Sequence, residues 1–246
     1  MNTVNQAPET ISSIQGIISK IQNNSVDAEI IIEDTRSLIS EIDGAIKAWQ
    51  TLNWDHVSKQ LDFLISRQNW RSLPLASVPI AVKDVYDTAD FVTTYGSTIY
   101  ENHRPSTDAK LVAILRSLGA IVVGKTVTTE FAYWQPGPTV NPHNTRHTPG
   151  GSSSGSAAAV SCGMVPLALG SQTAASIIRP ASYCGIYGFK PSYGVLPLEG
   201  VKPLAPSLDH AGFLARSVED IKICFTAVLD HEHFSQNSAT LIEKPL

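Results

Sequence analysis

Two short segments rich in glycine and serine constrain the fold of this 246-residue chain more than any other feature. The first is Gly150–Ser156 (GGSSSGS) and the second is Gly170–Ser176 (GSQTAAS). An apolar stretch follows the first segment at Ala157–Val160, and another precedes the second at Val165–Leu169. Glycine-serine runs are often flexible linkers, but apolar elements on their flanks favour packed turns. We therefore expect two serine-bearing loops held against regular structure.

The pattern of apolar residues around these loops predicts an α/β fold. Val78–Val82 is a short apolar run that suits a buried strand, and it ends in Lys83-Asp84. Thr107-Asp108 suits the start of a helix, Gly119 suits its end, and Ile121–Val123 predicts the next strand. A helix followed by a strand in this way implies a sheet covered by helices.

The first seventy residues differ, because their apolar residues recur at helical spacing. One such stretch surrounds Ile14 to Ile21, a second runs from Ser25 to Trp49, and a third spans Val57 to Ile65. Amphipathic helices normally bury their apolar side. We expect residues 1–70 to form a helical segment packed on an α/β domain that occupies residues 71–246.

Composition excludes several classes of protein. A hydrophobic content of 43% and a net charge of −4 argue against disorder, and no basic cluster indicates a nucleic-acid partner. No apolar run approaches the roughly 20 residues of a membrane helix, and residues 1–20 lack the apolar segment of a signal peptide. Three widely spaced cysteines indicate neither a disulfide framework nor a CxxC metal site. We expect a cytoplasmic protein with no nucleic-acid or membrane partner.

Residues 119–126 match the spacing of a phosphate-binding loop, with Gly-Lys-Thr at the end. Such a loop follows a strand and opens a helix, so that free backbone amides face the phosphate. Here Ala120–Val123 is itself the expected strand, and a helix precedes it. The context therefore argues against nucleotide binding.

Residues 151–155 match the GxSxG nucleophile elbow, which would make Ser153 the nucleophile. An elbow needs a buried strand directly before it, whereas this segment follows a proline-rich loop. His210 is a conceivable partner base, but nothing in the sequence fixes it beside Ser153. We regard the elbow as the weaker interpretation of this loop.

His143 and His147 are four residues apart, which is a spacing of metal ligands on a helix. Pro142 and Pro149 oppose a helix here, and no third ligand is apparent. We expect loop histidines and no metal site.

Three long segments, in this order along the chain, together resemble the amidase signature family: Pro79–Asp84, Pro149–Ala159 and Gly170–Ala181. Shorter supporting matches are Thr94–Ser97, Gly188–Ser192 and Ser207–Asp209. The likeness spans roughly residues 78–229. It implies a mixed central sheet with helices on both faces, hydrolysis of a small linear amide, and no metal or organic cofactor.

The resemblance also assigns a Ser–Ser–Lys triad. Lys83 would be the base, Ser152 the bridging serine preceded by a cis peptide bond, and Ser176 the nucleophile. A serine hydroxyl is a poor nucleophile until a base takes its proton. Lysine serves as a base only when neutral, so burial must lower its pKa from about 10.4. The bridging serine would relay the proton between nucleophile and base.

The backbone amides of Thr173, Ala174, Ala175 and Ser176 would form the oxyanion hole by the same resemblance. The family usually carries Gly-Gly where this chain has Ala174-Ala175. Alanine lacks the freedom of glycine at positive φ. We therefore expect the turn to be distorted or rigid.

Two further positions resemble the small-molecule branch of the family, which includes malonamidase and biuret-hydrolase-like enzymes. Gln172 stands where tRNA-dependent amidotransferase subunits commonly have aspartate. Arg179 lies three residues after Ser176, whereas those subunits usually place it two after. Arg179 suits either a substrate carboxylate, bound through a bidentate fork, or backbone carbonyls in a structural role.

Family enzymes are generally much longer than this chain. We therefore expect a sheet that is incomplete at its C-terminal end, and either a homo-oligomer or a complementing polypeptide. Beside the amidase, two other functions stay open. One is a catalytically weak or silent fragment or subunit that needs a partner chain, and the other is an amidotransferase A-type subunit.

Overall fold

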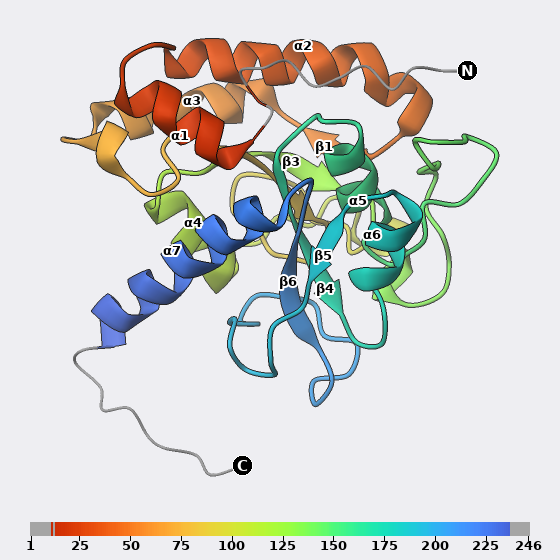
Figure 1. Ribbon diagram of the computed structural model, residues 1–246. Coiled ribbons are helices and arrows are strands. Elements are labelled where there is room, and N and C mark those ends of the chain that lie inside the picture. The colour runs from red at the N-terminus through yellow and green to blue at the C-terminus, as the bar shows by residue number, and fades with distance from the viewer. Residues whose placement is uncertain (1–10, 12, 237–246) are drawn as a thin grey trace.

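The computed structural model describes residue 11 and residues 13–236. Its centre is a six-stranded sheet with the strand order β1-β3-β2-β4-β6-β5 (Figure 1). The strands are β1 (Trp49–Leu52), β2 (Pro79–Lys83), β3 (Ile121–Thr126), β4 (Leu167–Gln172), β5 (Tyr187–Phe189) and β6 (His210–Ala215). Strand β2 is parallel to β3 and β4, whereas the β1–β3, β4–β6 and β5–β6 pairs are antiparallel. The expected mixed sheet is confirmed.

Helices cover both faces of this sheet. They are α1 (Ile14–Gln22), α2 (Ala28–Ile46), α3 (Trp54–Ser66), α4 (Lys110–Ser117), α5 (Ser154–Ser161), α6 (Ile178–Tyr183) and α7 (Val218–Gln236). Figure 1 shows α1 to α3 together at one end of the molecule, α4 beside α7, and α5 beside α6. The predicted strands near residues 78–82 and 121–123 are confirmed as β2 and β3, and the apolar stretch at Ala157–Val160 lies in α5.

Alternation along the strands divides the core into two layers. Ile80, Val82 and Leu169 face the layer that α1, α4 and α7 complete. Ala81 and Ala168 face the other layer, where the alanines of α5 pack. Small side chains on both surfaces let α5 lie close to the sheet, which brings the loop before α5 to the ends of the central strands.

The N-terminal segment contributes a strand as well as helices. The expected second helix ends at Ile46, because Lys47 adopts a left-handed conformation with φ 58°. The chain then enters β1, and Trp49, expected on a helix, pairs with Thr126 of β3. Gly124 permits this pairing, because a Cβ there would collide with the Thr51 carbonyl oxygen. The domain boundary at residue 70 stays a prediction.

The start of α4 also differs from expectation. Ala109 is the N-cap residue, and no side chain caps this helix. Asp108 instead accepts a hydrogen bond from the Ala89 backbone N–H at 2.8 Å and forms an ion pair with Arg116 at 3.0 Å. Gly119 ends the helical segment at φ 100°, as expected.

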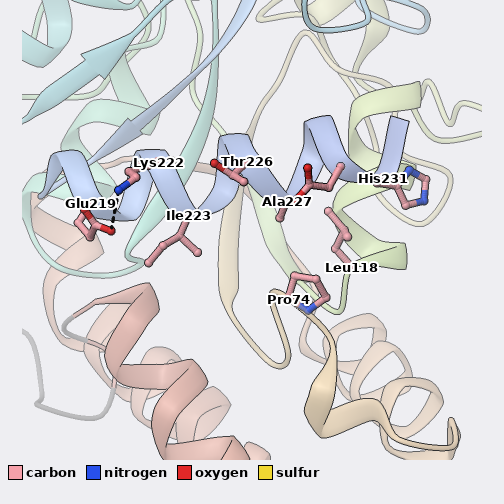
Figure 2. A pocket seen from close by; sticks show the side chains of 9 residues that line it. Pro74, Leu118, Glu219, Lys222, Ile223, Thr226, Ala227 and His231 are labelled. Atoms are coloured by element: carbon pink, nitrogen blue, oxygen red, sulfur yellow. Dashed lines mark ion pairs between the residues drawn. The ribbon is translucent and has the colours of Figure 1, made fainter. Parts of the chain in front are cut away.

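A hollow of about 640 Å³ lies along α7, where Pro74 and Leu118 face Ile223 and Ala227 (Figure 2). It contains none of the three expected triad residues. Among the described helices, none combines the length and hydropathy needed to span a bilayer.

Candidate active site

The candidate site lies where the parallel strands β2 and β4 end. Val82 of β2 is level with Leu169 of β4, so Lys83 and Ser171 lie near the carboxyl ends of their strands at the same edge of the sheet. Lys83 is fully buried, and Ser171 is 9% exposed. The carboxyl ends of parallel strands thus bring a buried amine beside the second glycine-serine loop.

The Lys83 side-chain nitrogen contacts hydroxyl groups. Its Nζ donates hydrogen bonds to Ser152 Oγ at 2.7 Å, to Ser171 Oγ at 2.9 Å and to the Ser171 carbonyl at 3.3 Å. Burial lowers the pKa of Lys83 well below its usual range, and the negative charge of Asp209 opposes this shift. A buried amine of this kind suits a proton acceptor.

Ser152 is held by its backbone neighbours. The Gly151–Ser152 peptide bond is cis, as the family resemblance implied. The Ser152 carbonyl accepts from the Thr129 N–H at 3.2 Å, and the Gly151 carbonyl accepts from Arg179 Nε and Nη2 at 3.0 and 2.8 Å. Arg179 therefore makes the backbone-carbonyl contact that was one of its two alternatives, and it supports the loop that carries Ser152. Binding of a substrate carboxylate, the other alternative, stays a prediction.

Gly155, the third glycine of the first loop, is required by close packing. A Cβ at this position would collide with the Ala48 carbonyl oxygen and lie 2.5 Å from the Val127 backbone nitrogen. The Gly155 N–H donates to the Val127 carbonyl at 2.9 Å. Glycine thus lets the first turn of α5 rest directly on the chain that leaves β3.

Ser176 lies in the turn between β4 and α6. Gln172 Oε1 accepts from the N–H groups of Ile177 and Ile178 at 2.9 and 3.0 Å, which fixes this turn at the start of α6. The Ser176 carbonyl accepts from the Ser153 N–H at 3.2 Å. The structure therefore brings the three expected triad residues into one place. Lys83 contacts Ser152, and Ser176 contacts Ser153, the residue that follows Ser152.

The turn before Ser176 is compatible with an oxyanion hole. In the described chain, the N–H groups of Ala174, Ala175 and Ser176 have no backbone acceptor. Neither alanine has a positive φ. Alanine therefore needs no glycine-like freedom here, and the backbone angles give no sign of the expected distortion. Thr173, the fourth expected donor residue, uses its hydroxyl to donate to Asp209.

The competing motifs fit the geometry less well. Ser153 Oγ donates to the Ser171 carbonyl at 3.4 Å, while His210 Nδ1 contacts the Leu208 carbonyl at 2.7 Å, so the two elbow residues have other partners. His143 Nε2 contacts the Cys184 carbonyl at 2.8 Å. No cluster of three or more potential metal ligands occurs among the described residues.

Lys125, the lysine of the phosphate-loop pattern, lies in β3 and is fully buried. It forms an ion pair with Asp84 at 2.9 Å and donates to Thr93 Oγ1 and to the Tyr86 carbonyl. Asp84 also accepts hydrogen bonds from the Thr94 hydroxyl and backbone N–H. The lysine is thus part of a buried polar network next to Lys83, which the sequence did not indicate.

A cleft of about 350 Å³ opens beside the site. Ser171 and Thr173 line it next to the candidate triad, and Asp209 and Lys202 line it farther along. Asp209 and Ser171 belong to recognised motifs, although sequence reasoning gave them no role. Lys202 lies outside those motifs, and no local pattern marks it.

The family model for amidases, described as Amidase, matches residues 31–245. This chain belongs to the amidase family. The peptide amidase of Stenotrophomonas maltophilia superposes with a TM-score of 0.85 at 30% identity, over 97% of this chain and 52% of that one.

Curated amidase relatives point in two directions. The A-type subunit of the glutamyl-tRNA(Gln) amidotransferase of Exiguobacterium sibiricum is 37% identical over 93% of this chain and 48% of its own. The AtzE subunit of the 1-carboxybiuret hydrolase of Pseudomonas sp. strain ADP is 38% identical over 89% of this chain and 49% of its own. The chain spans about half the length of the curated relatives it matches.

Proposed function

We propose that this amidase hydrolyses a small linear carboxamide through an acyl-enzyme on Ser176. The observation that carries the proposal is the contact of 2.7 Å between the buried Lys83 Nζ and Ser152 Oγ. No acidic side chain among the described residues forms an ion pair with Lys83. Burial without a contacting carboxylate favours the neutral amine, which is the form that accepts a proton.

The reaction begins when Lys83 takes the Ser152 hydroxyl proton and Ser152 takes the proton of Ser176. The Ser176 oxygen then bonds to the amide carbon, and the former carbonyl oxygen becomes an oxyanion. Backbone N–H groups of Thr173, Ala174, Ala175 and Ser176 stabilise that charge, and loss of one such donor typically costs about 10²-fold or more in rate.

Collapse of this intermediate breaks the carbon–nitrogen bond. Ser152 passes a proton to the departing amine and is reprotonated by Lys83, which leaves the acyl group on Ser176. A water molecule, deprotonated along the same route, then attacks the ester and releases the carboxylic acid. Each proton that leaves a nucleophile is thereby returned to a leaving group.

A second candidate is an amidotransferase A-type subunit. The identity of 37% with such a chain from Exiguobacterium sibiricum favours it. It would need a partner chain and tRNA, whereas the amidase would act on the amide alone. A third possibility, a chain that is silent without a complementing polypeptide or a second copy, differs in the reactivity of Ser176. The cytoplasmic location expected from the sequence likewise remains a proposal.

Labelling with a fluorophosphonate tests the assignment of the nucleophile. We expect the full chain to be labelled at Ser176, as mapped by mass spectrometry, and Ser176→Ala to lose labelling while it keeps its melting temperature. Ser153→Ala is the matched control, since it removes a neighbouring hydroxyl, and it should retain most of the labelling. Labelling at Ser153 instead would favour the nucleophile elbow.

A panel of simple amides then separates the candidate functions. Release of ammonia by the untreated chain alone, in a preparation that the fluorophosphonate is able to label, supports the amidase. Release that requires both tRNA and a partner chain supports the amidotransferase. A chain that is neither labelled nor active supports the silent alternative.

A further inference from the structure

Lys202 lines the cleft, and its side chain lies over three aromatic rings next to it. Its Nζ is 5.2 Å from the ring centre of Tyr95, 5.1 Å from that of Tyr100 and 5.9 Å from that of Phe131. Ring faces attract a cation while leaving its N–H groups able to donate. Within the described chain, no acidic side chain forms an ion pair with Lys202. One lining residue of the cleft thus carries a positive charge that aromatic rings position and no carboxylate contacts.

The backbone of Lys202 is bound to the segment that directly follows β2, the strand that carries the candidate base. Its N–H donates to the Val85 carbonyl at 2.8 Å, and Val201 forms an antiparallel bridge with Tyr86. Val85 and Tyr86 follow closely on Lys83 in the sequence. The backbone of Lys202 is therefore anchored to the short stretch of chain that begins at Lys83.

The two segments that carry these rings contain residues with left-handed backbone conformations. Tyr95, Phe131 and Ala132 all have positive φ values, of 54°, 50° and 58°, although none is glycine. Such conformations are costly and cluster where structure serves binding or catalysis. The Phe131 N–H donates to the Tyr95 carbonyl at 2.8 Å, which joins the two ring-bearing segments. Ala132 and Lys202 both line the cleft.

We propose that Lys202 is a specificity-determining residue that binds a carboxylate carried by the amide substrate. This inference rests on the proposed amide hydrolysis at Ser176 and names its substrate class. Asp209 also lines the cleft, but its oxygens already accept from the Thr173 hydroxyl and from the N–H groups of Leu204 and Ala205. The Asp209 carboxylate therefore already accepts three hydrogen bonds, whereas the N–H groups of the Lys202 ammonium can donate to a ligand.

The same comparison distinguishes Lys202 from Arg179. Two nitrogens of Arg179 donate to the Gly151 carbonyl, so its guanidinium is partly engaged in supporting the Ser152 loop. The Lys202 ammonium is a compact point charge that needs no planar partner. A cleft of about 350 Å³ limits the ligand to a small molecule. A short amide with a carboxylate at its other end matches these features.

The first test compares succinamate, which carries the carboxylate, with succinamide, its neutral counterpart. We expect Lys202→Gln to raise KM for succinamate about 10- to 100-fold, with kcat and the KM for succinamide little changed. Lys202→Arg should recover most of the loss. Lys222→Gln, which removes an exposed lysine on α7, is the matched control and should leave both constants unchanged.

A binding measurement separates this inference from the proposed function. Succinate should slow fluorophosphonate labelling of Ser176 in the wild type and in Lys202→Arg, and it should fail to do so in Lys202→Gln. Labelling that succinate slows equally in all variants, or equal KM changes for both substrates, would overturn the role of Lys202 and leave the amidase standing. A wild-type chain that is never labelled at Ser176 would overturn both.

Discussion

Two buried lysines on neighbouring strands meet opposite kinds of surroundings. Lys83 ends β2 and contacts Ser152 and Ser171, whereas Lys125 lies in β3 and forms an ion pair with Asp84 at 2.9 Å. Both side chains are fully buried. Burial lowers the pKa of each lysine, but in Lys125 the Asp84 carboxylate opposes the shift at contact distance.

The difference teaches that burial alone does not make a lysine a base. A contacting carboxylate stabilises the protonated form and turns the same side chain into a structural cation. Hydroxyl partners satisfy the amine in either protonation state, because a hydroxyl both donates and accepts. Both kinds of surroundings meet at the neighbouring residues Lys83 and Asp84. Lys83 contacts the serine hydroxyls, and Asp84 forms an ion pair with Lys125.

Replacement of Lys83 should have the largest effect on reactivity. We expect Lys83→Met to slow fluorophosphonate labelling of Ser176 by about 10²- to 10⁴-fold, because the variant lacks the base. Its stability should fall far less than that of a variant that leaves a buried charge unpaired. Labelling kinetics and chemical denaturation on one preparation measure both. Labelling at the wild-type rate would exclude Lys83 as the base.

Replacement of Lys125 should act mainly on stability. Lys125→Met leaves Asp84 buried without its counter-ion, and such changes cost about 3–5 kcal/mol in the free energy of unfolding. The double variant Asp84→Asn/Lys125→Met should recover most of this loss, because asparagine can still accept from Thr94. Denaturant titration measures the difference. A Lys125→Met variant as stable as the wild type would contradict a structural role for the pair.

The pH dependence of labelling and of stability should show the smallest difference between the two lysines. Labelling of Ser176 should rise about tenfold per pH unit below the lowered pKa of Lys83 and level off above it. Between that pKa and the ordinary lysine value near 10.4, the unfolded chain binds more protons than the folded chain. Stability therefore rises with pH in this window, by about 1.4 kcal/mol per unit for one proton, and is lost as pH falls through it.

Lys83→Met should lack the rise of labelling with pH and the part of the stability slope that Lys83 contributes, whereas Lys125→Met, measured where it remains folded, should keep the rise of labelling. A labelling rate that rises with pH only near the ordinary lysine pKa would show that the surroundings of Lys83 do not hold it neutral.

Local sequence located the main residues of the candidate site because they lie in dense, ordered motifs. Lys83 follows a continuous apolar run, and Ser152 and Ser176 lie in glycine-serine loops beside regular structure. What sequence missed is the pairing between distant segments. The contact of Lys83 with Ser171 depends on the β2–β4 register, and the rings around Lys202 come from two loops far away in the chain.

The fold shows the same division. Helices α1 to α3 follow from apolar periodicity, but β1 does not. Trp49 is a buried apolar residue, and such a residue suits the inner face of a helix as well as that of a strand. Only the left-handed Lys47 and the distant partner β3 separate strand from helix here. Thr107-Asp108 likewise suits a helix cap, yet Asp108 binds Arg116 and Ala89 instead.

The strand order has a consequence for the chain as it is synthesised. Strands β2 and β3 can pair once residue 126 has emerged, but β4, which encloses Lys83, ends at residue 172. Until β4 docks, Lys83 meets water and keeps the proton of an ordinary lysine. Ser176 follows β4 in the sequence, so the proposed nucleophile and the proposed base come together only in the assembled sheet. We therefore expect labelling of Ser176 to report the completion of folding, because a nascent chain lacks the buried amine.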